Sequence, residues 1–124
     1  MANILIVDDE KALRQGLVFV LVRLGHTVRE ADDGQQALRL VAEQAPDLII
    51  TDLFMPEKDG IEVIREIRQM HPQLPLIAMS GGIQGDYDTF LRMAKRLGVS
   101  GTLSKPFSIQ DFRATVEKVL GEQA

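Results

Sequence analysis

The stretch NILIVDDEKALRQGLVFVLVRLG, residues 3–25, contains one strand-then-helix cycle, and the rest of the chain repeats its pattern. Its first five residues form a continuous apolar run rich in β-branched side chains, which is typical of a strand buried on both faces. From Leu13 onward the apolar side chains recur at helical spacing, and Gly25 follows the last of them, as glycine commonly does just past a helix end. Residues 3–25 therefore predict a buried strand followed by an amphipathic helix.

Four further cycles of the same kind follow. Strands are predicted over residues 27–31, 47–51, 74–79 and 101–104. Helices are predicted over residues 36–45, 61–70, 87–97 and from Ser108 to about residue 120. Five such cycles in a row predict an α/β fold, a doubly wound (βα)5 sandwich whose parallel sheet is covered by helices on both faces.

For the last three predicted helices, the sequence also predicts buried positions and end residues. Ser108, with Asp111 three residues later, resembles a capping arrangement that opens the final helix. We expect that helix to bury Ile109, Phe112, Val116 and Val119 or Leu120. The helix over 61–70 is expected to bury Ile61, Ile64 and Ile67, with Met70 as a further candidate, and Gly98 is expected to end the helix over 87–97.

The composition is that of one globular domain. The chain has 124 residues, 45% of them hydrophobic and 26% charged, so we predict a single domain over 1–124 with its core at about 2–121. The chain has no Cys, no apolar run near the roughly 18 residues that span a bilayer, and no secretory signal pattern, so we expect a cytoplasmic protein without a membrane partner. The net charge of −4 and the lack of a basic cluster argue against a nucleic-acid partner.

Polar residues follow four of the five predicted strands. Asp8 and Asp9 follow the first strand, Asp52 the third, Ser80 the fourth and Lys105 the fifth. In doubly wound sheets ligands bind outside the carboxyl ends of the strands. These five side chains are therefore expected to converge on one site.

That set of side chains favours phosphoryl chemistry with a cation. Carboxylates at one rim repel each other by about 4 kcal/mol per pair at ~4 Å and an effective dielectric of ~20, so a cation is required. Oxygen ligands without His or Cys suit Mg²⁺, for which Asp8 and Asp9 are the better candidates. Asp52 is then left as a nucleophile that needs no general base, while Lys105 and Ser80 stabilise the phosphoryl oxygens.

Each residue also has a purely structural interpretation. Asp8 and Asp9 could cap the first helix, Asp52 and Ser80 could belong to turns, and Lys105 could be a solvated lysine. The coincidence of suitable residue types at four strand ends favours the functional interpretation.

Four segments carry a family resemblance: residues 6–10 (IVDDE), 52–56 with 59–61 (DLFMP and DGI), 78–81 (AMSG) and 104–107 (SKPF). In this order and spacing they resemble the receiver domain of two-component response regulators, of the stand-alone type similar to the chemotaxis regulator. The resemblance covers about residues 2–121 and implies a flavodoxin-like sheet of strand order 2-1-3-4-5.

The resemblance also implies a function. A sensor histidine kinase or histidine phosphotransfer protein would phosphorylate Asp52, and the domain would signal to a downstream protein by conformational change rather than act as a turnover enzyme. Asp9, Asp52 and the carbonyl of Phe54, assisted by Asp8, would ligate Mg²⁺, with Mn²⁺ as a possible substitute. Lys105 would contact the phosphate, the Lys105-Pro106 bond would be cis, and Ser80 would swing toward the phosphoryl group.

Two departures from the family pattern concern the switch. Many receivers have Tyr or Phe where this chain has Thr102, so aromatic gating is in doubt and the switch pair is Ser80 with Thr102. The loop after Ser80 is rich in glycine over residues 81–85, and phosphorylation could order it; a plain flexible connector is the alternative.

An apolar group on the first helix suggests a docking surface. Val18, Phe19 and Val22 fall off the core stripe, next to each other. Since the resembled family meets its kinase or phosphotransfer domain on that helix, we expect these residues to contribute to docking; a broad buried face is the alternative.

Two other functions remain open at this point. Haloacid-dehalogenase phosphatases also use a strand-end Asp with Mg²⁺. Their pattern is an Asp-x-Asp pair after the first strand, whereas the two Asp residues after the first strand here are adjacent. A receiver-shaped module that is never phosphorylated is the second alternative. The full acidic set together with Lys105 argues against it.

Overall fold

The computed structural model describes residues 1–53, 60–80 and 87–122, without the side chains of residues 87–91. Strands and helices alternate without exception along these residues. The strands are β1 (Asn3–Val7), β2 (Thr27–Ala31), β3 (Leu48–Asp52), β4 (Leu76–Ser80) and β5 (Gly101–Ser104). The helices are α1 (Lys11–Arg23), α2 (Gly34–Glu43), α3 (Gly60–Met70), α4 (Tyr87–Arg96) and α5 (Ile109–Gly121).

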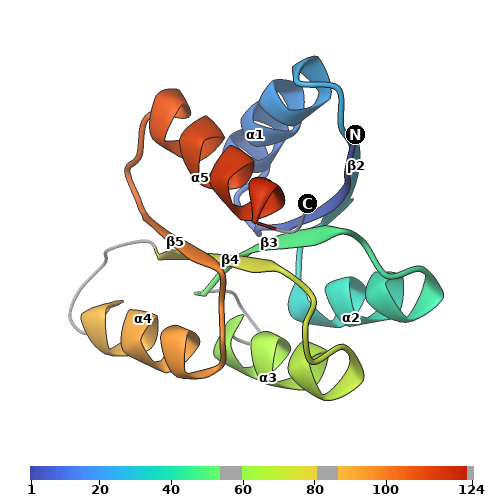
Figure 1. The fold of residues 1–124 in the computed structure, drawn as a ribbon, viewed down its shortest axis with the longest axis vertical. Coiled ribbons are helices and arrows are strands. Elements are labelled where there is room, and N and C mark those ends of the chain that lie inside the picture. Colours follow the sequence, from blue (N-terminus) through green and yellow to red (C-terminus); the bar gives the residue numbers. More distant parts are fainter. Residues whose placement is uncertain (54–59, 81–86, 123–124) are drawn as a thin grey trace.

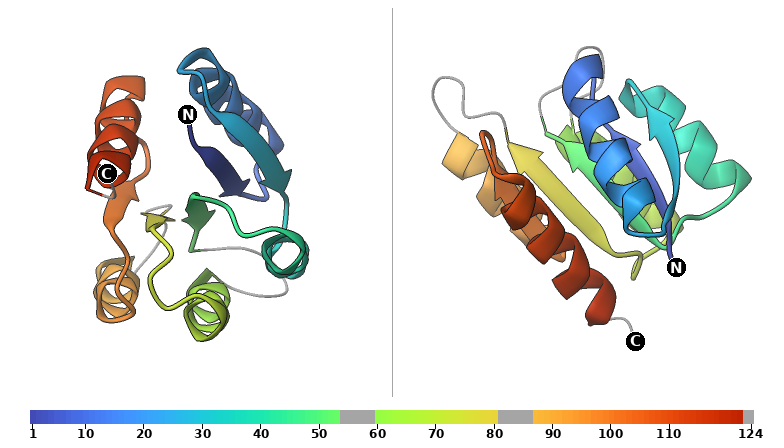
Figure 2. Two further views of the ribbon diagram at one scale, coloured as in Figure 1. Left: turned by 45° about the vertical axis from the view of Figure 1, so that its right-hand side comes forward. Right: turned by 90° about the horizontal axis from the view of Figure 1, so that it is seen from above.

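The five strands form one parallel sheet in the order β2-β1-β3-β4-β5 (Figure 1). Helices α1 and α5 lie on one face of the sheet, and α2, α3 and α4 lie on the other, so the molecule has three layers (Figures 1 and 2). The predicted fold class, the doubly wound arrangement and the strand order are confirmed. In this order the chain moves outward from β1 in one direction to β2, and then returns past β1 to β3, so the strand order reverses beside β1.

The central strands are buried on both faces, and each contributes side chains to the two hydrophobic clusters that lie on opposite faces of the sheet. In β1, Leu5 and Val7 pack toward α2 and α3, whereas Ile4 and Ile6 pack toward α1 and α5. This explains why the central strands read as continuous apolar runs rather than as alternating patterns. The edge strand β2 is more exposed, which fits its weaker apolar pattern.

Several helix ends follow their local sequence. The Ser108 side chain accepts a hydrogen bond of 3.0 Å from the Asp111 amide, which confirms the predicted cap of α5. Gly25 and Gly98 have positive φ angles of 95° and 81° just past α1 and α4. Helix α2 begins two residues earlier than expected because Asp33 caps it by accepting from the Gln36 amide at 2.8 Å.

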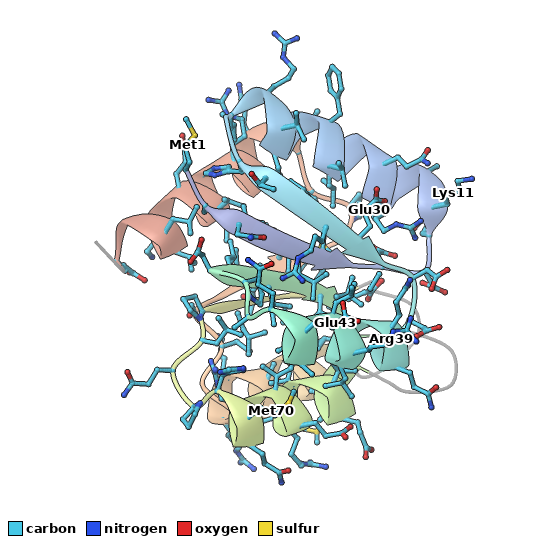
Figure 3. All side chains as sticks on the ribbon, turned by 90° about the vertical axis from the view of Figure 1, so that its right-hand side faces the viewer. Met1, Lys11, Glu30, Arg39, Glu43 and Met70 are labelled. Carbon is cyan, nitrogen blue, oxygen red and sulfur yellow. The ribbon has the colours of Figure 1, made fainter. Side chains whose placement is uncertain are left out.

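Two side chains expected in the core are exposed. Ile109 is 60% exposed, because the part of α1 that faces it offers the small residues Ala12 and Gly16, and a shallow cavity remains between them. Met70, labelled in Figure 3, is also exposed, since it is the last residue of α3 and lies beyond the stretch that the sheet covers. The predicted inward positions of Ile109 and Met70 are therefore wrong.

One arginine ties the ends of two helices together on the side opposite α1. The Arg68 guanidinium donates to the carbonyls of Leu97 at 2.9 Å, Gly98 at 2.8 Å and Leu74 at 2.7 Å. These carbonyls lie at the end of α4 and just before β4, where helix and loop ends leave acceptors without partners. Arg68 thus holds α3, α4 and β4 in a fixed relation.

Among the described residues, no helix is long and apolar enough to cross a bilayer.

Candidate functional site

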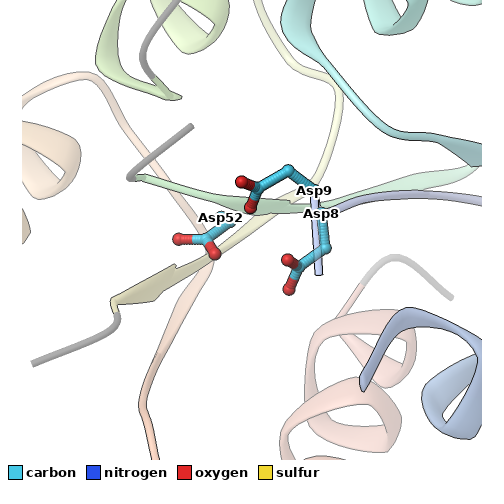
Figure 4. Close-up of side chains that lie close together, drawn as sticks. All are labelled: Asp8, Asp9 and Asp52. Carbon is cyan, nitrogen blue, oxygen red and sulfur yellow. The ribbon is translucent and has the colours of Figure 1, made fainter. Parts of the chain in front are cut away.

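Three carboxylates gather where β1 and β3 end. Val7 pairs with Thr51 in the sheet, so the residues that follow, Asp8 and Asp52, emerge side by side. One oxygen from each of Asp8, Asp9 and Asp52 lies within 4.8 Å of the others (Figure 4). Asp8 and Asp52 are buried, whereas Asp9 is exposed to solvent. Such a set offers two enclosed ligand oxygens and one at the open side of the site.

Lys105 supplies the positive charge that this cluster requires. Its Nζ lies 2.9 Å from Asp8 Oδ2 and 2.7 Å from Asp52 Oδ2, joining residues that are far apart in sequence. The Lys105 amide donates to the Ser80 carbonyl at 2.7 Å, which anchors this residue to the end of β4. The Lys105-Pro106 bond is cis, as the family resemblance implied.

The protonation of Lys105 reflects two opposing effects. Burial by itself lowers the pKa of Lys105, but its hydrogen bonds to Asp52 and Asp8 and their negative charges outweigh burial and hold the pKa above its ordinary value. Lys105 is therefore an ammonium ion throughout the neutral range. A permanent cation at this place can stabilise an added dianionic group as well as the carboxylates.

Asp8 both shapes its own turn and takes part in the site. Its Oδ1 accepts from the Glu10 amide at 2.8 Å, while its Oδ2 accepts from Lys105. The residue that caps α1 is Glu10, without a side-chain hydrogen bond, so neither Asp8 nor Asp9 is the helix cap. The capping interpretation of the acidic pair is therefore wrong, although Asp8 does bond to the turn.

Ser80 lies at the end of β4, at the same edge of the sheet as the carboxylates. The residue is fully buried, and its Oγ has no hydrogen-bond partner among the described residues. A buried hydroxyl without a partner is unusual in a folded protein and is costly. Thr102, the second predicted switch residue, lies on β5 and pairs with Ala78 of β4, which is two residues before Ser80. Thr102 is half-buried.

Some sequence-based predictions fall elsewhere. Phe54 and the glycine-rich segment 81–85 lie outside the described residues. On α1, Phe19 is 63% exposed and Val22 is exposed as well, and the Arg23 guanidinium lies 5.7 Å from the Phe19 ring centre. Val18 differs from them, because it packs partly against the core beneath α1. Its placement off the core stripe is wrong in part.

Gly60 contributes to the site in a way that the sequence did not indicate. It opens α3, and its amide donates to the Leu53 carbonyl at 2.9 Å. A Cβ atom at Gly60 would lie 2.2 Å from the carbonyl oxygen of Asp52 and 2.5 Å from the Cα of Leu53. Such distances are far inside contact range, so only glycine lets α3 start directly against the Asp52 main chain.

Replacing Gly60 with Ala is accordingly expected to displace Asp52 and destabilise the fold. Overpacking of this kind costs about 2–3 kcal/mol of unfolding free energy, which urea denaturation would measure. Gly16→Ala is the matched control, since a Cβ there meets nothing within 4 Å and alanine favours the helix by about 0.5–1 kcal/mol. Equal stability of the Gly60→Ala variant and the unchanged protein would contradict the close approach.

The fold and the site together define a class of protein: a doubly wound domain that gathers carboxylates and a lysine at the carboxyl edge of its sheet, as phosphoacceptor signalling domains do. The family model for the response regulator receiver domain matches residues 4–117, and the chain belongs to that family. The family resemblance drawn from the sequence is thereby confirmed.

Relatives in this family include proteins of quite different organisation. The sensor kinase CckA of Brucella abortus is 38% identical over 124 residues, which cover 98% of this chain and 13% of that protein. The DNA-binding transcriptional regulator NtrC of Azospirillum brasilense is 39% identical over 96% of this chain and 24% of its own length. The chain thus spans less than a quarter of either relative.

One solved structure matches this chain over nearly the whole length of both. The response regulator receiver domain protein from Clostridium thermocellum superimposes with a TM-score of 0.89 at 30% sequence identity, covering 99% of this chain and 97% of that chain. What this chain has in common with its relatives is therefore the receiver domain.

Proposed function

We propose that this receiver domain accepts a phosphoryl group on Asp52 from a sensor histidine kinase or a histidine phosphotransfer protein, in a reaction that requires Mg²⁺. The observation that carries the proposal is the ion pair of Lys105 with both Asp8 and Asp52, next to Asp9. One ammonium ion shared by two buried carboxylates leaves the site with excess negative charge, which favours binding of a divalent cation.

The side chains present fit Mg²⁺. Every donor in the cluster is a carboxylate oxygen, and Mg²⁺ prefers one or two carboxylates together with waters and a phosphate. Asp9 and Asp52 would bind the ion directly and Asp8 would assist, and the carbonyl of Phe54 remains a predicted ligand. Mn²⁺, which accepts the same hard ligands, should substitute. When bound, the cation neutralises charge on the phosphoryl group during transfer.

The transfer step forms one bond and breaks another. A carboxylate oxygen of Asp52 bonds to phosphorus while the bond between phosphorus and the donor imidazole nitrogen breaks, and the electron pair of that bond returns to the imidazole. The product is an aspartyl phosphate. Because Asp52 is held by Lys105 in a buried position, the nucleophile is oriented before the donor arrives, and Lys105 can then bind a phosphoryl oxygen.

Ser80 and Thr102 form the proposed switch. The buried Ser80 hydroxyl has no hydrogen-bond partner among the described residues, and a phosphoryl oxygen on Asp52 would offer it an acceptor. Its movement would pull on the segment that follows β4, including residues 81–85. With Thr102 in place of an aromatic side chain, that movement would not be coupled to the rotation of a ring on β5.

The signal would then pass to a protein partner. We propose that Phe19 and Val22, with a smaller contribution from Val18, help to dock the phosphodonor, and that an unidentified downstream protein reads the switch. Each chain would accept one phosphoryl group, as a stoichiometric acceptor rather than as a turnover enzyme. The protein would work in the cytoplasm, and residues 1–124 would fold as one domain.

Intact-mass analysis after incubation with acetyl phosphate tests the proposal. In the presence of Mg²⁺ one phosphoryl group should add to each chain, and removal of the cation with a chelator should reduce the rate at least about 100-fold, since cation stabilisation of a phosphoryl transition state is worth several kcal/mol. Restoration with Mn²⁺ is expected. Labelling that proceeds equally well in chelator would contradict the proposed metal dependence.

A further inference from the structure

Arg14, at the end of the first turn of α1, reaches back to the turn that carries Asp8 and Asp9. Its Nη1 donates to the Asp8 carbonyl oxygen at 2.6 Å, and its Nε donates to Glu30 Oε1 at 2.8 Å. The Arg14 side chain is only 12% exposed. A guanidinium in this position has two partners on two different elements, the β1–α1 turn and β2.

The course of the main chain through residues 8–10 decides how the acidic side chains are presented. The Asp8 amide donates to the Ala31 carbonyl at 3.1 Å, and the Glu10 amide donates to the Asp8 side chain at 2.8 Å. Neither of these bonds uses the Asp8 carbonyl, whose described partner is Arg14. The orientation of the peptide between Asp8 and Asp9 therefore depends on Arg14.

Asp9 is the residue most sensitive to that peptide. Its side chain is exposed, so its position follows from the backbone that carries it rather than from surrounding packing. A small rotation of the peptide between Asp8 and Asp9 would move the Asp9 carboxylate away from the oxygens of Asp8 and Asp52. The three oxygens now lie within 4.8 Å of one another.

Glu30 holds the guanidinium in place from the other side. Glu30 lies on β2, opposite Ile6 in the sheet, and Figure 3 shows it beside the first turns of α1. It is 40% exposed, so its attraction to Arg14 is partly screened by water. Its contribution is the orientation of a planar fork whose second nitrogen must meet the Asp8 carbonyl.

We propose that Arg14, oriented by Glu30, is a positioning residue for the cation site: it holds the peptide between Asp8 and Asp9 so that both carboxylates face the Mg²⁺ position. The inference rests on the proposed function, because it concerns the affinity of the same site. For the loss of Arg14, a positioning role and simple electrostatics predict opposite changes in Mg²⁺ affinity. Removal of a nearby positive charge would tighten cation binding, whereas loss of positioning weakens it.

The test is the Mg²⁺ dissociation constant of the unphosphorylated chain, from the amide NMR shifts of residues 8–10 during titration with MgCl₂. The Arg14→Met variant, which keeps an unbranched side chain without donors, should bind Mg²⁺ about tenfold more weakly, as is usual when a residue behind a metal ligand is lost. Arg113→Met on the exposed face of α5 is the matched control for loss of one arginine charge, and its affinity should be unchanged within about twofold.

Two further variants separate positioning from general damage. Glu30→Gln should weaken Mg²⁺ binding by about threefold, and the Arg14→Met/Glu30→Gln double variant should be no weaker than Arg14→Met alone, since the two residues act in series. Arg14→Lys keeps the positive charge and N–H donors on a single nitrogen but loses the planar fork, so it should recover part of the affinity. Thermal unfolding of each variant, followed by circular dichroism, sets the temperature at which all are folded.

The outcomes are distinct. Unchanged or tighter Mg²⁺ binding by folded Arg14→Met, with normal binding by the unchanged protein, overturns the positioning role and leaves the proposed function standing. Additive losses in the double variant overturn the role of Glu30. Absence of Mg²⁺ binding in the unchanged protein overturns both the cation site and this inference.

Discussion

The Asp52→Asn variant is expected to take up no phosphoryl group from acetyl phosphate under conditions in which the unchanged protein is fully labelled. The amide of Asn has no anionic oxygen to attack phosphorus, although its size and shape match those of Asp. The loss should exceed about 1,000-fold in rate, because the nucleophile itself is removed. Intact-mass analysis over a time course measures it directly.

Asp32→Asn is the matched control for this variant. Asp32 is exposed just beyond β2, near the same rim of the sheet, and its side chain takes no part in the carboxylate cluster. Its labelling rate should stay within about twofold of the unchanged protein, as expected for an exposed charge outside the carboxylate cluster that water and salt screen. Labelling of Asp52→Asn at the normal rate would move the acceptor to another residue and end the present proposal.

The Lys105→Met variant is expected to lose both stability and phosphoryl transfer. Without the ammonium ion, the buried carboxylates of Asp8 and Asp52 lose the positive charge that offsets their mutual repulsion. Removing one partner of a buried ion pair costs up to about 3–5 kcal/mol, but the Lys105 side chain is 16% exposed, and screening by water reduces the expected loss to about 2 kcal/mol. The labelling rate should fall about 100-fold, since a charge that stabilises the transferred group is gone.

Added Mg²⁺ should partly rescue the stability of Lys105→Met. A cation that binds the folded chain raises its stability by mass action, and it replaces the lost positive charge in the variant. Urea denaturation with and without Mg²⁺ should therefore show a larger cation effect in the variant than in the unchanged protein. Lys11→Met, on the exposed first turn of α1, is the control and should behave like the unchanged protein in both measurements.

The pH dependence of this effect has a definite direction. The pKa of Lys105 is raised above its ordinary value of 10.5, so the folded protein holds the lysine proton more tightly than the unfolded chain does. The stabilisation is complete below pH 10.5 and is lost as the pH rises through the higher folded value. The stability difference between the unchanged protein and Lys105→Met should be constant between about pH 7 and pH 10 and should narrow above that range. A difference that vanishes near neutral pH would contradict the raised pKa.

Local sequence was sufficient for much of the fold. The apolar runs of β1, β3 and β4 are continuous because those strands are covered on both faces. Ser108 begins α5 and Gly25 ends α1 through contacts within a few residues. Side chains at the ends of elements were less predictable. Ile109 fits the apolar period of α5, but its burial depends on the size of the α1 residues that it meets, Ala12 and Gly16.

Some residues of the candidate site could likewise be predicted from the sequence, and others could not. The positions of Asp8, Asp9, Asp52 and Lys105 at strand ends were accessible from sequence, because parallel strands bring their carboxyl ends to one edge. The roles of Arg14 and Gly60 were not, because each acts through the main chain of another segment: Arg14 through the Asp8 carbonyl and Gly60 through its contact with Asp52. Gly60 belongs to the segment 59–61 that carries the family resemblance, but a pattern of residue types does not say which backbone atoms a residue approaches.

The amino-acid sequence by itself determined which residues form strands and helices, and which chemical groups stand at the edge of the sheet, because periodicity, capping and residue chemistry act over a few neighbours. Only the tertiary structure decided that one lysine bridges two buried carboxylates, that a helix start presses against Asp52, and that an arginine orients the turn beside Asp9. Those contacts join segments up to 97 residues apart, and their distances depend on how the layers pack against the sheet.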